Sequence, residues 1–137
     1  MEVLYIDDDP DDIDFFTEAL KNVDETIELV HVDGCESALN HLRNSKVLSD
    51  VIFVDLHLPK IEGLECVKII KADKLLSHIP IVVIATTIPS RDVDEFNKLG
   101  VYYFLSKTAL LSKIEPALRV IIDSLCKGGD VQMPGRL

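Results

Sequence analysis

Four aspartates and one lysine each lie just behind a short apolar run of this chain, and they are Asp7, Asp8, Asp9, Asp55 and Lys107. Carboxylates that a fold brings close together repel one another unless a cation lies among them. The group therefore predicts a site for a hard metal ion with oxygen ligands. Mg²⁺ is the expected ion because one or two carboxylates plus a phosphate oxygen commonly hold it, and Asp8 and Asp55 are the expected direct ligands.

Asp55 is the expected reactive residue of this group. A carboxylate beside a divalent cation and a lysine can attack a phosphoryl group, because both cations neutralise the charge that shifts onto the phosphoryl oxygens. We therefore interpret Asp55 as a phosphoacceptor and Lys107 as its cationic partner. The competing interpretation is an aspartate that only caps the turn behind its strand.

Five apolar runs supply the strands that would position these residues. They alternate with segments whose apolar residues recur at helical spacing, which predicts a doubly wound α/β fold with a parallel sheet covered on both faces by helices. In such a sheet, ligands bind beyond the carboxyl ends of the strands, which is where the four aspartates and the lysine fall. The predicted strands are residues 3–6, 27–32, 51–54, 81–85 and 101–105.

Length and composition predict one compact, soluble domain. The chain has 137 residues, 47% of them hydrophobic, and no uninterrupted apolar stretch of membrane-spanning length, so we expect a cytoplasmic protein. The formal net charge of −10 argues against a nucleic-acid surface, and the lack of a membrane-spanning apolar stretch leads us to expect no membrane partner. We expect the domain over residues 1–126 and a flexible C-terminal tail over residues 127–137, which is punctuated by glycine and proline.

The three cysteines and the acidic N-terminal segment receive plain structural interpretations. Cys35, Cys66 and Cys126 are odd in number and widely spaced, so we expect small core residues and no disulfide bond. Residues 1–28 hold eleven acidic residues and one basic residue. For Asp12, Asp14 and Glu18, which lie in this segment, a solvated acidic helix face and a functional role both stay open.

The motifs, in this order and spacing, resemble the CheY-like receiver domains of bacterial two-component response regulators, of the stand-alone, single-domain type. The resemblance covers residues 3–125. The residues that carry it are the acidic pair Asp7-Asp8, the stretch 54–63 around Asp55, Pro80 before the fourth strand, and Lys107.

The resemblance implies the fold and the role of each site residue. The expected sheet has five strands in the order 2-1-3-4-5, with five helices. Asp7, Asp8 and Asp55 would form the metal site, with His57 contributing its backbone carbonyl. Phe104 falls at the family's rotating aromatic residue, which moves inward when a hydroxyl residue at the end of the fourth strand turns toward the phosphoryl group.

One position departs from the family pattern. Ungapped counting places the switch hydroxyl on Ala85, which cannot donate a hydrogen bond, and Thr86 follows it directly. Either a shift of one residue lets Thr86 serve, or phosphorylation is coupled to the output surface weakly or by another route.

The resemblance also implies partners and a signalling role in phosphorelay. The phosphodonor would be a sensor histidine kinase or a histidine phosphotransfer protein. An unknown downstream protein would bind the surface formed by the fourth helix, the fifth strand and the last helix. The chain would not be an enzyme beyond self-catalysed phosphorylation and dephosphorylation. The apolar stripe of the last helix leaves a homodimer interface and simple coverage of the sheet both open.

Three alternatives compete with an active receiver. A degenerate receiver would act as a binding module independently of phosphorylation, and Ala85 favours it. A haloacid-dehalogenase-like phosphatase would use the D-x-D spacing of Asp7 and Asp9, with Asp7 as nucleophile. An EF-hand calcium loop would use Asp7, Asp9, Asp11 and Glu18, although Asp12 stands where that loop needs glycine.

Overall fold

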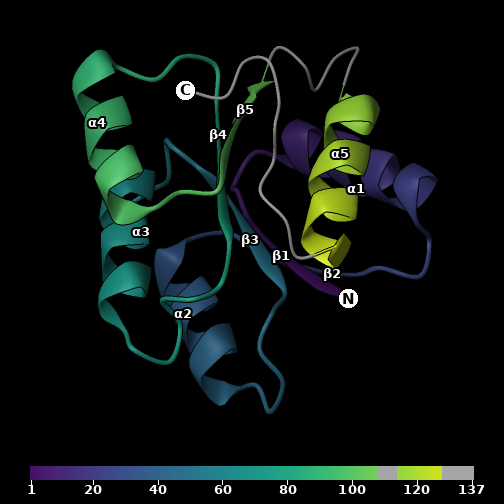
Figure 1. Ribbon diagram of the computed structural model, residues 1–137, viewed down its shortest axis with the longest axis horizontal. Helices are drawn as coiled ribbons and strands as arrows, with labels where there is room; N and C mark the ends of the chain where they lie inside the picture. The colour runs from purple at the N-terminus through teal and green to yellow at the C-terminus, as the bar shows by residue number, and fades with distance from the viewer. Residues whose placement is uncertain (108–113, 128–137) are drawn as a thin grey trace.

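The computed structural model describes residues 1–107 and 114–127 and shows a three-layer α/β domain (Figure 1). A sheet of five parallel strands in the order β2-β1-β3-β4-β5 forms the middle layer. The predicted fold class and strand order are confirmed. The elements are β1 (Glu2–Ile6), α1 (Pro10–Val23), β2 (Glu28–Val32), α2 (Cys35–Asn44), β3 (Val51–Asp55), α3 (Gly63–Ala72), β4 (Ile81–Ala85), α4 (Ser90–Leu99), β5 (Tyr103–Ser106) and α5 (Ile114–Lys127).

The three inner strands are buried on both faces because their sequences are almost entirely apolar. Every residue of β3 and β4 is buried, as is every residue of β1 after Glu2. Neighbouring side chains point to opposite faces of the sheet. Leu4 and Ile6 pack into the core on the side of α2, α3 and α4, whereas Val3 and Tyr5 pack on the side of α1 and α5 (Figure 1).

The carboxyl ends of two strands extend one residue beyond their predicted bounds. Asp55 is the last residue of β3, where it pairs with Ile84 in β4, and the N–H of Leu56 continues the ladder to the carbonyl of Ile84. Ser106 likewise ends β5. The last residue of each of these strands is therefore polar, because backbone pairing extends one residue beyond the apolar run. The last helix includes Lys127, and the predicted tail beyond it lies outside the described residues.

The first helix begins at a position that its sequence specifies. Asp9 is its N-cap, and its side chain accepts hydrogen bonds from the backbone N–H groups of Asp11 and Asp12. Pro10 occupies the first helical turn, where it needs no hydrogen-bond partner for its nitrogen. This cap places the first turn of α1 beside the carboxyl end of β1.

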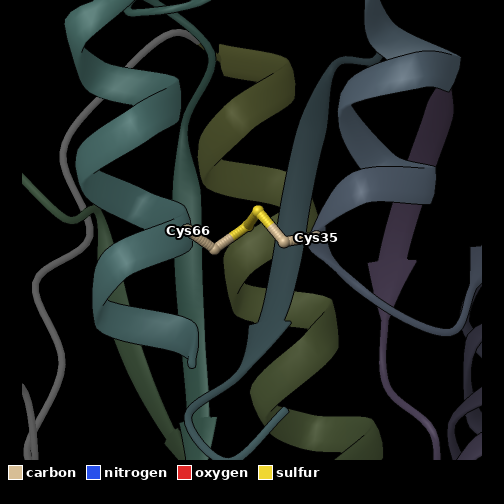
Figure 2. The surroundings of a disulfide bond; sticks show 2 residues. All are labelled: Cys35 and Cys66. Carbon is tan, nitrogen blue, oxygen red and sulfur yellow. A yellow bond between two sulfur atoms is a disulfide. The ribbon is translucent and has the colours of Figure 1, made fainter. Parts of the chain in front are cut away.

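Cys35 and Cys66 form a disulfide bond, so the prediction that the chain contains none is wrong (Figure 2). The two residues are 31 positions apart in sequence, but they lie in the first turns of α2 and α3, which are neighbours on one face of the sheet. Sequence spacing does not reveal this proximity because it arises from the crossover topology. Cys35 and Cys66 are core residues as predicted. Cys126 is exposed and free, so the predicted core position is wrong for this cysteine.

No helix among the described residues has both the length and the apolar character needed to cross a membrane.

Candidate functional site

The candidate site lies at the carboxyl edge of the sheet, by which we mean the edge where all five strands end. The strand order reverses at β1 and β3, which are hydrogen-bonded neighbours. Asp7 follows β1 directly, and Asp55 ends β3. The two carboxylates therefore meet at the point where ligands bind in doubly wound sheets.

Asp7 is fully buried, and hydrogen bonds hold both its side chain and its backbone. Its Oδ2 accepts a hydrogen bond of 2.6 Å from the hydroxyl of Tyr5, and its Oδ1 accepts one of 3.0 Å from the backbone N–H of Asp9. Its backbone carbonyl lies 2.8 Å from Nε2 of His31. Burial, followed by the contact with Asp7, raises the pKa of Tyr5 far above its usual range, so this hydroxyl remains a donor.

Asp55 is 2% exposed, and both of its carboxylate oxygens have partners. Oδ1 accepts a hydrogen bond of 3.1 Å from the backbone N–H of His57, and Oδ2 accepts one of 2.8 Å from Nζ of Lys107. Burial raises the pKa of Asp55 to about 6, although the bonds from Lys107 and His57 act in the opposite direction. The Asp55 carboxylate is thus a poorly solvated anion beside a cation.

Lys107 has a second carboxylate partner that the sequence did not assign to it. Its Nζ lies 2.9 Å from Oδ2 of Asp12, in the first turn of α1, as well as 2.8 Å from Asp55. Burial lowers the pKa of Lys107, but its bonds to these two carboxylates outweigh burial and raise the pKa overall. Asp12 is therefore part of the site, whereas Asp14 and Glu18 are exposed. The sequence signal that could have identified Asp12 is the pair Asp9-Pro10. An N-cap aspartate followed by proline fixes where α1 begins, and thereby which residue of its first turn faces the strand ends.

Asp7, Asp8 and Asp55 form the group that fits a metal ion. One carboxylate oxygen from each lies within 4.8 Å of the others, and Asp8 is exposed while the other two are buried. Within residues 1–107 and 114–127, Lys107 is the one cation paired with this group, and it shares its charge with Asp12. The excess of negative charge and the all-oxygen donor set suit a hard divalent cation such as Mg²⁺. Asp9 does not join the metal group because its side chain caps α1, so the expectation that it converges with Asp7, Asp8 and Asp55 is wrong. The fourth carboxylate of the site is Asp12, which reaches it through Lys107.

The predicted switch residues lie beside this group. Ala85 ends β4 and is buried, whereas Thr86 is exposed directly behind it. Phe104 is 6% exposed, with its ring centroid 5.8 Å from that of Phe96 in an edge-on arrangement. Ala85, Thr86 and Phe104 line one side of a 650 Å³ pocket between β4, α4 and β5. The side chain of His57 is exposed, and its backbone N–H, not its ring, contacts Asp55.

Comparison with known proteins identifies the family. The family model for the response regulator receiver domain matches residues 3–119, and the chain belongs to this family. Phosphorylation on an aspartate is the general function of these domains, which act in two-component signalling. They are signalling domains rather than true enzymes.

Individual relatives are more distant. The polar-differentiation response regulator DivK of Brucella ovis is 33% identical over 58 residues, which are 42% of this chain and 47% of DivK. The chain thus matches about half the length of this curated relative.

Two solved structures cover nearly the whole chain. The phosphorylated cyanobacterial phytochrome response regulator RcpA has a TM-score of 0.83 and 29% identity, covering 96% of this chain and 98% of RcpA. The Mn²⁺-bound form of the response regulator Rcp1 has a TM-score of 0.78 and 25% identity, covering 99% of this chain and 98% of Rcp1.

Two of the alternatives do not agree with the structure. The EF-hand hypothesis is wrong because the chain is helical from Pro10 onward, so Asp11 and Glu18 lie on α1 and not in a calcium loop. A phosphatase nucleophile at Asp7 is disfavoured because that carboxylate is fully buried and bonded to Tyr5.

Proposed function

We propose that Asp55 accepts a phosphoryl group from a phosphohistidine of a sensor kinase or a histidine phosphotransfer protein, with Mg²⁺ held by Asp7, Asp8 and Asp55. The observation that carries the proposal is the ion pair between Asp55 and Lys107 next to the Asp7-Asp8-Asp55 group. The phosphorylated receiver would then signal by contact with another protein.

The covalent step is a transfer between two nucleophiles. A carboxylate oxygen of Asp55 forms a bond to phosphorus, and the bond from phosphorus to the donor histidine nitrogen breaks, with its electron pair remaining on the nitrogen. The product is an acyl phosphate, which water later hydrolyses to inorganic phosphate and the original carboxylate. A bound Mg²⁺ would supply positive charge to the phosphoryl oxygens.

The residues of the chain have separate tasks in this step. Lys107 donates hydrogen bonds from its charged ammonium. Asp12 holds that ammonium at the carboxyl edge when the Asp55 carboxylate becomes an acyl phosphate. The backbone N–H of His57 orients the Asp55 carboxylate. The hydroxyl of Tyr5 fixes the Asp7 carboxylate, one of the three that would hold the metal. We keep the backbone carbonyl of His57 as a further proposed metal ligand.

The response of the output surface depends on the residues around Ala85. We propose that the downstream protein binds the surface of α4, β5 and α5. We also propose that Thr86 and Phe104 change position when Asp55 is phosphorylated, and that Thr86 takes the role of a hydroxyl at position 85. A degenerate receiver that binds its partner without phosphorylation is the second candidate. Ala85 favours it because a methyl group makes no hydrogen bond to a phosphoryl oxygen.

Intact mass after incubation with acetyl phosphate and Mg²⁺ separates the two candidates. We expect a gain of one phosphoryl group in the parent protein and in Asp14→Asn, an exposed control on α1 with the same change of charge. Asp55→Asn should gain none. A parent protein that binds Mg²⁺ but gains no phosphoryl group would favour the degenerate receiver, and a gain that survives Asp55→Asn would overturn the site.

A further inference from the structure

The disulfide bond between Cys35 and Cys66 links the helices α2 and α3 (Figure 2). Cys35 is the first residue of α2, and Cys66 lies in the first turn of α3, where its backbone N–H donates to the carbonyl of Glu62. The bond thus joins the N-terminal turns of two neighbouring helices. We propose that it is a reversible redox modification site, which a dithiol reductant opens, and that it holds the loop between β3 and α3 in its phosphorylation-competent position.

The first residue of α3 transmits the position of the helix to Asp55. The backbone N–H of Gly63 donates a hydrogen bond of 2.9 Å to the carbonyl of Leu56. A side chain at Gly63 would overlap the carbonyl oxygen of Asp55 and lie 2.7 Å from Cα of Leu56. The start of α3 is therefore packed directly on the backbone of the acceptor residue, three positions before Cys66.

A small cavity gives a thiolate access to one sulfur of the pair. Cys35 lines a cavity of 120 Å³ together with Glu36 and Ser37 of α2 and Lys60 and Ile61 of the loop between β3 and α3. Cys66 does not line this cavity and is fully buried. Cys35 is 2% exposed, but it is the cysteine of the pair that lines the cavity, so an incoming thiolate attacks its Sγ.

The exchange is balanced by the reductant's two thiols. The first thiolate forms a bond to Sγ of Cys35, the bond between Cys35 and Cys66 breaks, and Cys66 leaves as a thiolate that takes up a proton. The second thiolate of the reductant then closes its own disulfide and releases Cys35. Cys35 is a good leaving group because the N-terminus of α2 stabilises its thiolate. The protein gains two thiols and the dithiol is oxidised to a disulfide.

The chemistry of the compartment favours a reversible role. In a cytoplasmic protein, which the sequence leads us to expect, disulfide bonds of mesophiles are usually transient and sense redox state. Opening the bond removes the covalent link that holds the start of α3 against α2. The loop between β3 and α3, which Gly63 packs against Asp55, is then held less rigidly in the position that phosphorylation needs. The effect on phosphorylation rests on the proposed function, but the redox chemistry does not.

Thiol counting tests the redox site directly. Alkylated in denaturant without reductant, the air-oxidised full chain should add one label, at Cys126. After native treatment with dithiothreitol, acid quenching and alkylation in denaturant, it should add three, and native treatment with oxidised dithiothreitol should return it to one. Cys126→Ser should add no label when oxidised, two after reduction and none after reoxidation. Three labels in the air-oxidised protein, or one label after native dithiothreitol treatment when the same reductant in denaturant gives three, would overturn the proposal.

The coupling to the site is tested by two further readouts on the same samples. We expect amide exchange at His57 and Gly63 to be at least tenfold faster after reduction, and phosphorylation by acetyl phosphate to be about threefold slower. Cys35→Ala/Cys66→Ala should match the reduced protein and ignore dithiothreitol. Equal exchange in both redox states would overturn the coupling. If neither state is phosphorylated, the proposed function fails, whereas label counts and amide exchange still decide this inference.

Discussion

The two edges of the sheet both carry carboxylates, but they use them in opposite ways. At the amino edge, where the strands begin, Glu2 accepts hydrogen bonds from the hydroxyl of Ser49 and from Nε2 of His41 at 3.1 Å. The backbone N–H of Glu2 in turn donates to Asp50. Burial raises the pKa of Glu2, but the bonds from Ser49 and His41 outweigh it and lower the pKa overall. This carboxylate is therefore stabilised as an anion by the fold.

At the carboxyl edge, the balance is reversed. Burial, with a contribution from the charge of Asp7, raises the pKa of Asp55 to about 6 against the bonds from Lys107 and His57, while one ammonium serves both Asp55 and Asp12. The fold holds an anion here at a cost in stability, as is common for sites selected for reactivity. The contrast fits a stabilising role for the amino edge and the proposed binding of a metal ion at the carboxyl edge.

Gly63→Ala should have the largest effect, because it disrupts the packing of the start of α3 on the backbone of Asp55 and Leu56. The new methyl group would overlap the carbonyl of Asp55, and backbone atoms cannot yield cheaply. We expect a loss of about 3 kcal/mol in the free energy of unfolding, measured by urea denaturation. Gly34→Ala is the matched control, since nothing lies within 4 Å of its new methyl group, and equal losses in both variants would contradict the packing described.

Asp8→Asn should weaken Mg²⁺ binding about tenfold, equivalent to about 1.4 kcal/mol, because it removes one charge and one strong oxygen ligand from the metal group. Isothermal titration calorimetry of the parent, Asp8→Asn and Asp14→Asn measures this. Asp14→Asn carries the same change of charge outside the group and should bind like the parent. An equal loss in both variants would mean that only net charge matters.

Asp55→Asn should stabilise the metal-free protein at neutral pH by about 1 kcal/mol, after allowance for solvent screening. The pKa of Asp55 rises from an ordinary 3.8 to about 6 in the folded protein. The folded state therefore binds more protons than the unfolded state between these values, and stability falls as pH rises through that window. Urea midpoints from pH 4 to 7.5 in EDTA should show this slope in the parent, but not in the variant.

Glu2→Gln should have the smallest effect, a loss of about 0.5 kcal/mol, because its hydrogen bonds are partly exposed. The sign with pH is opposite to that of Asp55. Since the folded-state pKa of Glu2 lies below its ordinary 4.5, its contribution is complete above that value and is lost as pH falls through the folded pKa. The difference in unfolding free energy between parent and variant should thus shrink in acid. A constant difference would show that the charge of Glu2 is irrelevant.

The sequence predicted what depends on local pattern. The apolar runs fixed the strands to within two residues. The rule that ligands bind where strands end selected Asp7, Asp8, Asp9, Asp55 and Lys107, of which Asp9 caps α1 instead. Asp12 was left open because helical patterning alone does not tell which acidic residue of a first turn reaches a lysine 95 positions away.

The disulfide bond was missed for a related reason. Cys35 and Cys66 come together through the crossover that sets α2 beside α3, and each cysteine alone fits a core position. Both misses involve contacts between elements far apart in sequence, which no local period encodes.

The identity of the modified residue tests the central claim most directly. The protein is phosphorylated with acetyl phosphate and Mg²⁺ and reduced with borohydride, which converts an aspartyl phosphate to homoserine, and the peptides are then mapped by mass spectrometry. We predict homoserine at position 55 and at no other aspartate. Homoserine at position 7 or 8, with Asp55 unchanged, would contradict the assignment of Asp55 as the phosphoacceptor.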